Sequence, residues 1–307
     1  QTRTSQFHAL PGSAAAENHG RTGQHLEGET AMSALGTTAT LKIMKLATGG
    51  CFLDGKELGE VFLPGREIPA GVAVGDEVEV FIYRDSEAVL TATTSRPLAE
   101  VGQCAFMKVL TVTKAGAFVD WGLPKDLFVP ASEQYKPLEA GRSYVILVYV
   151  DERTGRLAGT ARLHSRLSED GSDFRAGQEV DLIISGFSDL GYKAVINHTH
   201  LGLIFRDDTP EELRYGQKLK GYVKFVRTDK KIDLSLLPPG LSGLDMLGQR
   251  ILEHLRTHGR SSHLTDQSPS ADIAAAFGVS KSNYKKAVGR LYKQKKISIE
   301  TGRIVLL

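Results

Sequence analysis

The stretch that decides the fold is GAFVDWGLPKDLFVP, residues 116–130. Apolar and aromatic residues stand on either side of a short segment, Asp120 to Asp126, that is rich in glycine, proline and charge. Short apolar runs separated by such a segment predict two antiparallel strands joined by a turn. The stretch therefore predicts a β-hairpin that begins at Gly116 and ends at Pro130.

Gly116 belongs to a glycine spacing that occurs three times in the chain. Glycines separated by 14 and then by 25 residues stand at Gly36, Gly50 and Gly75, at Gly102, Gly116 and Gly141, and at Gly177, Gly191 and Gly216. A fixed spacing that returns in this way indicates a repeated supersecondary unit. We therefore expect three copies of one unit.

Each unit contains five predicted strands in about 65 residues. An apolar run follows the first glycine, a hairpin follows the second, and the third precedes a long strand, a polar turn and a closing strand. A small antiparallel sheet leaves its edges exposed unless it closes, and the OB-type barrel is the economical closed solution. The sequence predicts a mainly β protein with three tandem five-stranded barrels, at residues 36–96, 97–166 and 167–238.

The remaining segment, residues 239–307, is basic. From Leu241 to the end there are 11 Lys and Arg against 5 Asp and Glu, so this part carries +6 while the rest of the chain carries −4. The small overall charge of +2 therefore conceals a basic domain.

Periodicity in this segment predicts a winged helix-turn-helix domain, an α/β module. Leucines and isoleucine from Leu244 to Leu255 have helical spacing. A second helix is predicted to begin at Ser268-Pro269, as N-cap and first-turn proline, and to stop at Gly278, and Ser280 is a predicted cap for a third. A hairpin that turns at residues 300–302 follows and forms the wing.

The third predicted helix offers a candidate nucleic-acid surface. Off its apolar face lie Ser282, Asn283, Lys285, Lys286, Arg290 and Lys293. Short polar groups and long cations suit phosphate contacts with limited base readout. Two alternatives stay open, because lysines are commonly just solvated and because winged helices also dock proteins.

Two stretches of the chain resemble known families. The order of the glycines and strands, with Ile232-Asp233-Leu234-Ser235 closing the third unit, is similar to the S1 RNA-binding domain. GAFVDWGLPKDLFVP together with VYVDERTGRLAGTARL, residues 148–163, resembles the conserved virulence factor B family. That family carries three S1-type units and a C-terminal winged helix, and the resemblance covers about residues 36–307.

The resemblance implies RNA binding on the second and third strands of each barrel, where aromatic rings stack on bases and cations meet phosphates. S1 domains commonly carry an aromatic before the second glycine and a histidine at the end of the third strand. Those positions hold Gly49, Ala115 and Leu190, and Pro64, Pro130 and Phe205. Phe52 and Phe118 keep the middle aromatic position, although such a ring is equally an ordinary core residue. Phe62 and Phe128 are expected in the core.

The third barrel is therefore expected to be the best equipped for RNA. Tyr192, Lys193 and Phe205 are predicted to share one face. Further cations are predicted on or beside the long fourth strand: Lys218, Lys220, Lys224 and Arg227. We expect RNA contacts to concentrate in the C-terminal half of the chain, with the first two barrels serving more as spacer or partner surface.

Patterns typical of enzymes and metal sites are weak in this sequence. His198 and His200 form a pair that binds metal only if a third ligand converges, and no partner is evident. Cys51 and Cys104 lack a CxxC pattern and are expected to be reduced thiols. Phosphate-loop, GxSxG and HExxH motifs are missing, and the barrels and winged helix leave no room for a catalytic core of roughly 100 residues. We expect that the protein is not an enzyme and that it binds no metal, cofactor or small-molecule substrate.

The first 31 residues are polar and aperiodic, so residues 1–35 are predicted to be a disordered extension, with Met32 as the natural start. No apolar run approaches the roughly 18 residues of a membrane span. We expect a cytoplasmic protein without membrane contact.

Three functions remain open. The first is a regulator that binds single-stranded RNA through several weak modules acting together. The second is a DNA-binding transcription regulator whose barrels dock RNA polymerase or a ribosome component. The third is a scaffold that binds only proteins.

Overall fold

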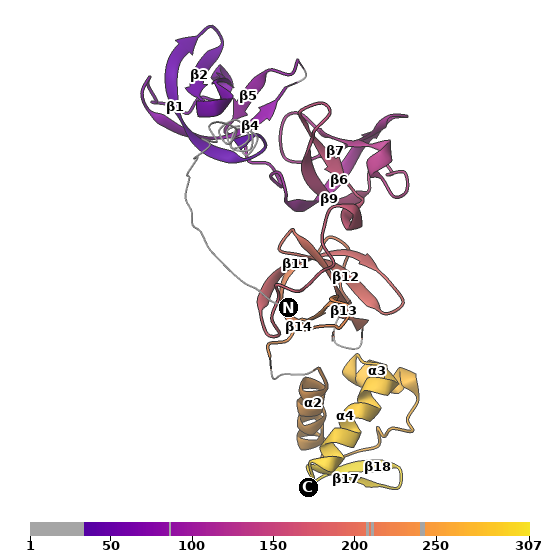
Figure 1. Ribbon diagram of the computed structural model, residues 1–307. Helices are drawn as coiled ribbons and strands as arrows, with labels where there is room; N and C mark the ends of the chain where they lie inside the picture. Colours follow the sequence, from indigo (N-terminus) through magenta and orange to yellow (C-terminus); the bar gives the residue numbers. More distant parts are fainter. Residues whose placement is uncertain (1–33, 86, 207–208, 210–211, 240–242) are drawn as a thin grey trace, which may run out of the picture.

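The protein consists of three β-barrels and a helical domain that follow one another along the molecule (Figure 1). The computed structural model describes residues 34–307 except 86, 207–208, 210–211 and 240–242. Of the predicted disordered extension, residues 1–35, all but Ala34 and Leu35 lie outside the described residues, as does the predicted start at Met32. Leu35 is buried in the core of the first barrel, so the ordered part of the chain begins earlier than predicted. In Figure 1 the first barrel lies at the opposite end of the molecule from the helical domain.

The first and third barrels are closed five-stranded sheets. The first contains β1 (Thr38–Ala47), β2 (Gly50–Asp54), β3 (Glu60–Pro64), β4 (Glu77–Arg84) and β5 (Leu90–Thr93). The third contains β11 (Glu179–Phe187), β12 (Gly191–Ile196), β13 (His200–Phe205), β14 (Lys218–Val226) and β15 (Ile232–Ser235). Closure comes from a parallel pairing of the third and fifth strands, in which Phe62 lies opposite Thr91 and Leu203 opposite Asp233.

The middle barrel has the same strand order, but its third and fifth strands are not joined by a hydrogen-bonded ladder. It contains β6 (Cys104–Val112), β7 (Gly116–Asp120), β8 (Leu127–Pro130), β9 (Ser143–Asp151) and β10 (Arg156–Thr160). Strands β8 and β10 are in contact, and the side chains of Leu127 and Val129 lie against Gly159. The predicted fold is confirmed, with side-chain contact replacing a hydrogen-bonded ladder at this seam.

The second glycine of each repeat is required by a close approach between strands. A Cβ atom at Gly50, Gly116 or Gly191 would lie 2.2, 2.3 or 2.1 Å from a carbonyl oxygen of the paired strand. No real side chain tolerates that distance, so only glycine lets the hairpin close here. The predicted hairpin from Gly116 to Pro130 is therefore confirmed, with Gly116 paired to Pro130 at its open end.

The first and second barrels pack through aromatic side chains. Phe81, on the fourth strand of the first barrel, meets Trp121 edge to face at 5.6 Å between ring centroids. The amide of Val101 donates to the carbonyl of Gly36 at 2.9 Å. Phe81 belongs to the same hydrophobic cluster as the core of the second barrel, so the two barrels share buried surface.

The second and third barrels also share a hydrophobic cluster. It contains Cys104, Val145, Leu147, Leu163, Leu167, Ile183 and Val195, with Leu201 and Tyr215 packed against it. The Tyr215 hydroxyl accepts from the amide of Val145 at 3.1 Å, and the Phe106 ring meets Tyr215 edge to face. Buried apolar contact and hydrogen bonds on both sides hold this junction in one arrangement.

The helical domain is the predicted winged helix-turn-helix. It contains α2 (Gly243–Thr257), β16 (Ser261–Ser262), α3 (Ser270–Phe277), α4 (Lys281–Lys293), β17 (Ile297–Glu300) and β18 (Arg303–Leu306). The second helix begins at Ser270 rather than after a Ser268 cap, because the Ser268 hydroxyl bonds within the preceding loop and Pro269 stands at the N-cap. Gly278 ends that helix in the left-handed conformation, and Ser280 caps α4, both as predicted.

Candidate nucleic-acid interface

The first two barrels each carry a pair of phenylalanines on the outer side of the hairpin. Phe52 and Phe62 lie directly opposite each other on β2 and β3, with ring centroids 5.4 Å apart. Phe118 and Phe128 repeat this arrangement on β7 and β8 at 5.0 Å. All four rings are partly exposed.

Phe62 and Phe128 were expected in the core, and the structure places them outside. In β3 the neighbouring Val61 and Leu63 are fully buried, so the strict alternation of a strand turns Phe62 outward. The same alternation in β8 buries Leu127 and Val129 and turns Phe128 outward. The outer aromatic pair is therefore a feature of the first two barrels that the sequence prediction missed.

A lysine lies beside the first pair. The Lys45 ammonium lies 4.9 Å from the centroid of the Phe52 ring and 2.7 Å from the Glu60 carboxylate. Both charged groups are more than half exposed, so their ion pair is screened by solvent. Lys45 and Phe52 therefore place a cation beside an aromatic ring on the outer face of the barrel. Proteins that bind single-stranded nucleic acid combine these two kinds of group.

Tyr192 does not lie on the predicted face of the third barrel. Its side chain is 5% exposed and belongs to the barrel core. Tyr192 occupies the first position after the repeat glycine, and the corresponding residues Cys51 and Ala117 also point inward. The prediction of two aromatic rings on this face is corrected: Tyr192 is unavailable for stacking on a base.

Phe205, Lys193 and Arg227 remain at the surface of the third barrel. Lys193 is exposed at the position that holds Phe52 and Phe118 in the other barrels. The Arg227 guanidinium lies 5.4 Å from the Phe205 ring centroid. It also forms an ion pair of 2.7 Å with Asp233, which is 3% exposed, so Arg227 has a structural partner.

The predicted lysines of β14 face a different part of the barrel. Lys218 and Lys220 pair in register with Ile183 and Asp181 on β11. Lys220 forms ion pairs with Asp181 at 2.8 Å and Glu179 at 3.7 Å, and the hydrogen bond to Asp181 raises the pKa of the lysine. Lys224 is exposed on the same strand. Of the predicted set, Arg227 therefore lies against Phe205, whereas Lys220 lies against acidic residues of β11 that offset part of its charge.

The predicted residues of the winged helix lie on or beside the outer face of α4. Tyr284, Ala287, Val288 and Leu291 are buried against the rest of the domain. Ser282, Lys285, Lys286 and Lys293 are exposed, and Asn283 is half-buried. Arg290 forms an ion pair of 3.0 Å with Asp245 on α2, so it holds two helices together as well as lying at the surface.

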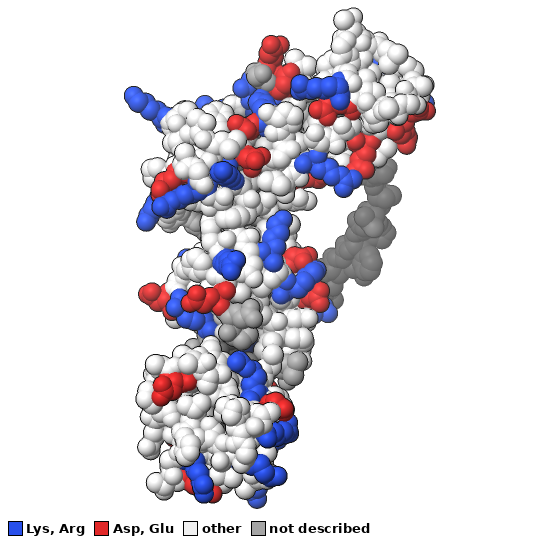
Figure 2. Space-filling model, turned by 180° about the vertical axis from the view of Figure 1, so that it is seen from behind, with Lys and Arg blue, Asp and Glu red and all other residues white. Residues whose placement is uncertain are grey.

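Charge is distributed unevenly between the barrels and the winged helix. On the face shown in Figure 2, acidic side chains lie among the basic ones over the barrels. The helical domain at the bottom of the same view shows more basic than acidic side chains. This distribution agrees with the charges of +6 and −4 found for the two parts of the sequence.

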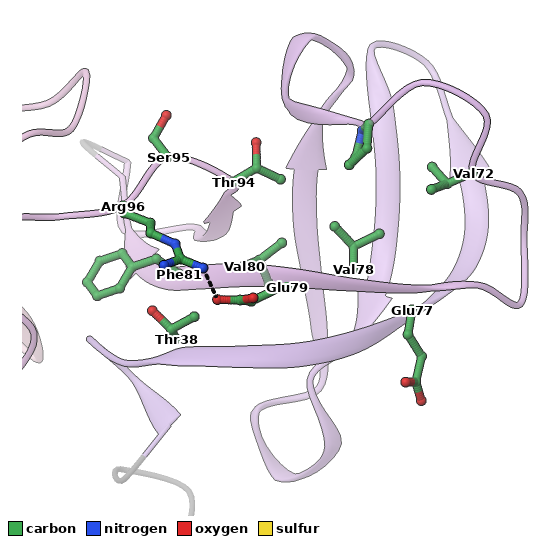
Figure 3. Close-up of a pocket in the computed structure, with 11 residues that line it drawn as sticks. Thr38, Val72, Glu77, Val78, Glu79, Val80, Phe81, Thr94, Ser95 and Arg96 are labelled. Atoms are coloured by element: carbon green, nitrogen blue, oxygen red, sulfur yellow. Dashed lines mark hydrogen bonds and ion pairs between the residues drawn. The ribbon is translucent and has the colours of Figure 1, made fainter.

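The groove on the first barrel has the wrong charge for nucleic acid. Figure 3 shows this groove of about 370 Å³, which is lined by Glu77 and Glu79 and by one cation, Arg96. Arg96 is bound to Glu79 at 2.9 Å. A groove with more acid than base repels phosphate, so the candidate interface lies elsewhere.

The two histidines and the two cysteines that were considered as metal ligands are engaged in packing and hydrogen bonding or are buried. His198 Nδ1 accepts from the amide of Cys104 across the junction between barrels, whereas the His200 ring packs against Phe174. Within the described ranges, no three His, Cys, Asp or Glu residues come together as metal ligands. Cys51 and Cys104 are free and buried, and burial raises the pKa of the Cys104 thiol to about 12.

Comparison with known proteins agrees with this architecture. The S1 domain family matches residues 35–95, and the CvfB-like winged helix domain family matches residues 249–306. Conserved virulence factor B of Staphylococcus aureus (strain bovine RF122 / ET3-1) is 30% identical over 250 residues, which is 76% of this chain and 80% of the relative. The chain belongs to the conserved virulence factor B family. The family resemblance that was seen in residues 116–130 and 148–163 is thereby confirmed.

Two further proteins are similar to this chain over most of its length. Uncharacterized protein YitL of Bacillus subtilis (strain 168) is 29% identical and covers 87% of this chain and 92% of its own length. A crystal structure of a multidomain protein with nucleic acid binding domains from Streptococcus pneumoniae TIGR4 is 28% identical, covers 90% of this chain and 99% of its own, and has a TM-score of 0.38. Neither matched domain family is an enzyme family. None of the helices in the described part of the chain is long and apolar enough to cross a membrane.

Proposed function

We propose that this protein binds single-stranded RNA through the outer faces of its barrels together with the basic winged helix, and that it regulates RNA without catalysis. S1 and winged-helix domains point to nucleic acid as the ligand, and the choice of single-stranded RNA is the proposal. A cytoplasmic location, and RNA polymerase or ribosome components as further partners, stay predictions.

The observation that carries the proposal is the repeated aromatic pair. Phe52 with Phe62, and Phe118 with Phe128, present partly exposed rings at equivalent places on two consecutive barrels. A base stacked on such a ring contributes about 1–3 kcal/mol and every base has a stacking face. Equivalent rings on successive modules therefore suit an unpaired strand that runs along the molecule.

This arrangement moves the expected contacts toward the N-terminal half. The third barrel was expected to dominate, and its share now rests on Lys193, Phe205 and Arg227, since Tyr192 is buried. The packed junctions fix the barrels relative to one another, so binding at one barrel raises the effective concentration of the strand at the next. Several weak sites then give useful affinity without a deep pocket.

Fluorescence anisotropy of the full chain tests the proposal. We expect tighter binding to single-stranded RNA than to duplex DNA at about 50 mM salt, and weaker binding at about 200 mM because counterions are released on binding. Replacing both Phe52 and Phe118 with leucine is expected to weaken binding by at least about tenfold, since two stacking contacts of about 1–3 kcal/mol each are lost. Arg96→Ala, in the acidic groove, is the matched control and should leave the affinity unchanged.

A second candidate function is duplex DNA binding by the winged helix. The exposed Ser282, Lys285, Lys286 and Lys293 on α4 favour it, because a helix with this face suits the major groove. Tighter binding to duplex DNA than to single-stranded RNA would support this function over the first. Binding to neither nucleic acid at the lower salt would contradict both and leave the protein-scaffold hypothesis.

A further inference from the structure

An exposed tyrosine on the second barrel lies beside a histidine and an arginine. Tyr135 is 69% exposed, and its ring centroid lies 4.8 Å from that of His164, with the planes tilted by 64°. The Arg162 guanidinium carbon lies 5.8 Å from the same ring centroid. The three side chains come from two segments: Tyr135 follows β8, and Arg162 and His164 follow β10.

The turn that carries Tyr135 is tied back to the barrel. It follows η3 (Ala131–Glu133), which continues directly from β8. The Gln134 side chain donates to the carbonyl of Val129 and accepts from the amide of Leu138, both at 2.9 Å. Tyr135 is therefore presented by a turn that is already ordered, which lowers the entropy cost of stacking a ligand on it.

The segment that carries Arg162 and His164 is anchored from the other side. His164 lies in η4 (Leu163–Ser165), whose Leu163 is buried in the hydrophobic cluster between the second and third barrels. Arg162 also donates to the carbonyl of Ser132 at 3.1 Å. Arg162 and His164 are thus held beside the Tyr135 ring, while the ring stays open to solvent.

Charge around this site favours a polyanion. Arg162, His164 and Lys136 are all exposed within the two segments. The nearby acid, Glu133, is engaged by Arg166 at 3.3 Å, and that guanidinium also stacks on the Tyr149 ring at 4.0 Å. An open ring with the Arg162 guanidinium beside it and Lys136 next to it in the chain matches the requirements of an unpaired nucleotide, with the base on the ring and the phosphate on these two cations.

We propose that Tyr135, His164 and Arg162 form a stacking site for one unpaired RNA base at the end of the second barrel. The inference rests on the proposed RNA binding and adds a site distinct from the outer pair of Phe118 and Phe128. Since β8 carries Phe128 and leads straight into the turn of Tyr135, the site extends the path of the strand toward the junction with the third barrel.

Variants of the full chain test the site against single-stranded RNA. Tyr135→Ala is expected to weaken binding by about 5- to 20-fold, while Tyr135→Phe keeps the ring and should bind within about twofold of the original protein. Arg162→Ala is expected to reduce the slope of log affinity against log salt by about 0.7, as expected for the loss of one phosphate contact. Leu46→Ala removes a side chain of matched exposure, 68%, from the first barrel and should change little.

Ultraviolet crosslinking to uridine-containing RNA, read by mass spectrometry, locates the contact directly. A crosslinked peptide containing Tyr135 is the expected result. If the original protein binds RNA but Tyr135→Ala binds equally well and crosslinks fall elsewhere, the inference is overturned and the proposed function stands. Equal weakening by Tyr135→Phe and Tyr135→Ala would also overturn it, because the ring would then not be the group that binds. If the original protein binds no single-stranded RNA, the proposed function itself fails.

Discussion

Gly116 and Gly289 are both glycines in regular structure, yet their surroundings predict opposite effects of one methyl group. At Gly116 a Cβ would lie 2.3 Å from the Val129 carbonyl oxygen and 2.9 Å from the Phe128 ring. We expect Gly116→Ala to lower the free energy of unfolding by about 2–4 kcal/mol, because the paired strands must separate or strain. Denaturant unfolding monitored by circular dichroism measures this.

Gly289 provides the matched control. It lies in the middle of α4, and a Cβ there would meet no atom within 4 Å. Gly289→Ala is expected to raise the stability of the winged helix by about 0.5–1 kcal/mol, because alanine loses less backbone entropy in a helix. Equal destabilisation by the two substitutions would contradict this account of the repeat glycine.

We predict that replacing Arg227 lowers the stability of the third barrel, in addition to any effect on RNA binding. Its removal leaves the carboxylate of Asp233, 3% exposed, without its ion-pair partner. We expect Arg227→Ala to destabilise the third barrel by about 3–5 kcal/mol, whereas Arg96→Ala, which breaks an exposed pair, should cost less than about 1 kcal/mol. Thermal unfolding of both variants makes the comparison. Partial recovery in the double variant Arg227→Ala, Asp233→Asn would show that the unpaired charge causes the loss.

At the level of elements, the junction between the second and third barrels is expected to respond to pH. His198 Nδ1 must be unprotonated to accept from the Cys104 amide at 3.0 Å. Burial lowers the pKa of His198, Lys218 lowers it further, and Asp181 raises it. Unfolded chains then bind a proton at a pH where the folded chain does not, so stability is complete above about pH 6.5 and falls as the pH drops below it.

Asparagine at this position separates protonation from hydrogen bonding. His198→Asn keeps an acceptor and tolerates the left-handed backbone at φ 63°. We expect this variant to lose most of the stability change between about pH 7 and pH 5 that the original protein shows at the junction. Hydrogen exchange of the Cys104 amide at the two pH values provides the readout. An unchanged pH dependence in the variant would assign it to other groups.

Element order was predictable from the sequence because it depends on local rules. The glycine spacing predicted the strands and the helix caps predicted α4, since both follow from backbone geometry within a few residues. The register error at Tyr192 arose from taking the residue after the repeat glycine as outward, although Cys51 and Ala117 at that position are apolar and small. The contact of Tyr135 with His164 had no periodic signal, because it joins two turns that only the closed barrel brings together.

At the scale of the whole molecule, we expect fragments cut at a junction between barrels to be less stable or more prone to self-association than the intact chain. A fragment of residues 171–307 would expose Ile183, Val195, Leu201 and Tyr215, which pack against the second barrel in the intact protein. Newly exposed apolar surface of this kind promotes association. We expect this fragment to self-associate or to melt at a lower temperature than the third barrel of the full chain.

Light scattering after size exclusion tests the fragment, with residues 243–307 as its control. The winged helix has a hydrophobic cluster of its own, from Leu247 to Ile304, so it should remain monomeric and folded. A monomeric larger fragment that melts like the full chain would contradict the importance of the junction. RNA binding is for this reason best measured on the full chain.

The shared burial at the two junctions also limits how this gene can change. The barrels are copies in topology, but Trp121 packs against Phe81 of the first barrel, and Tyr215 packs against Phe106 and accepts from the amide of Val145 of the second. Duplicating, deleting or reordering a unit would bring unmatched ends together. We therefore expect recombination among the three repeats to be selected against, because each unit is shaped to its own neighbour.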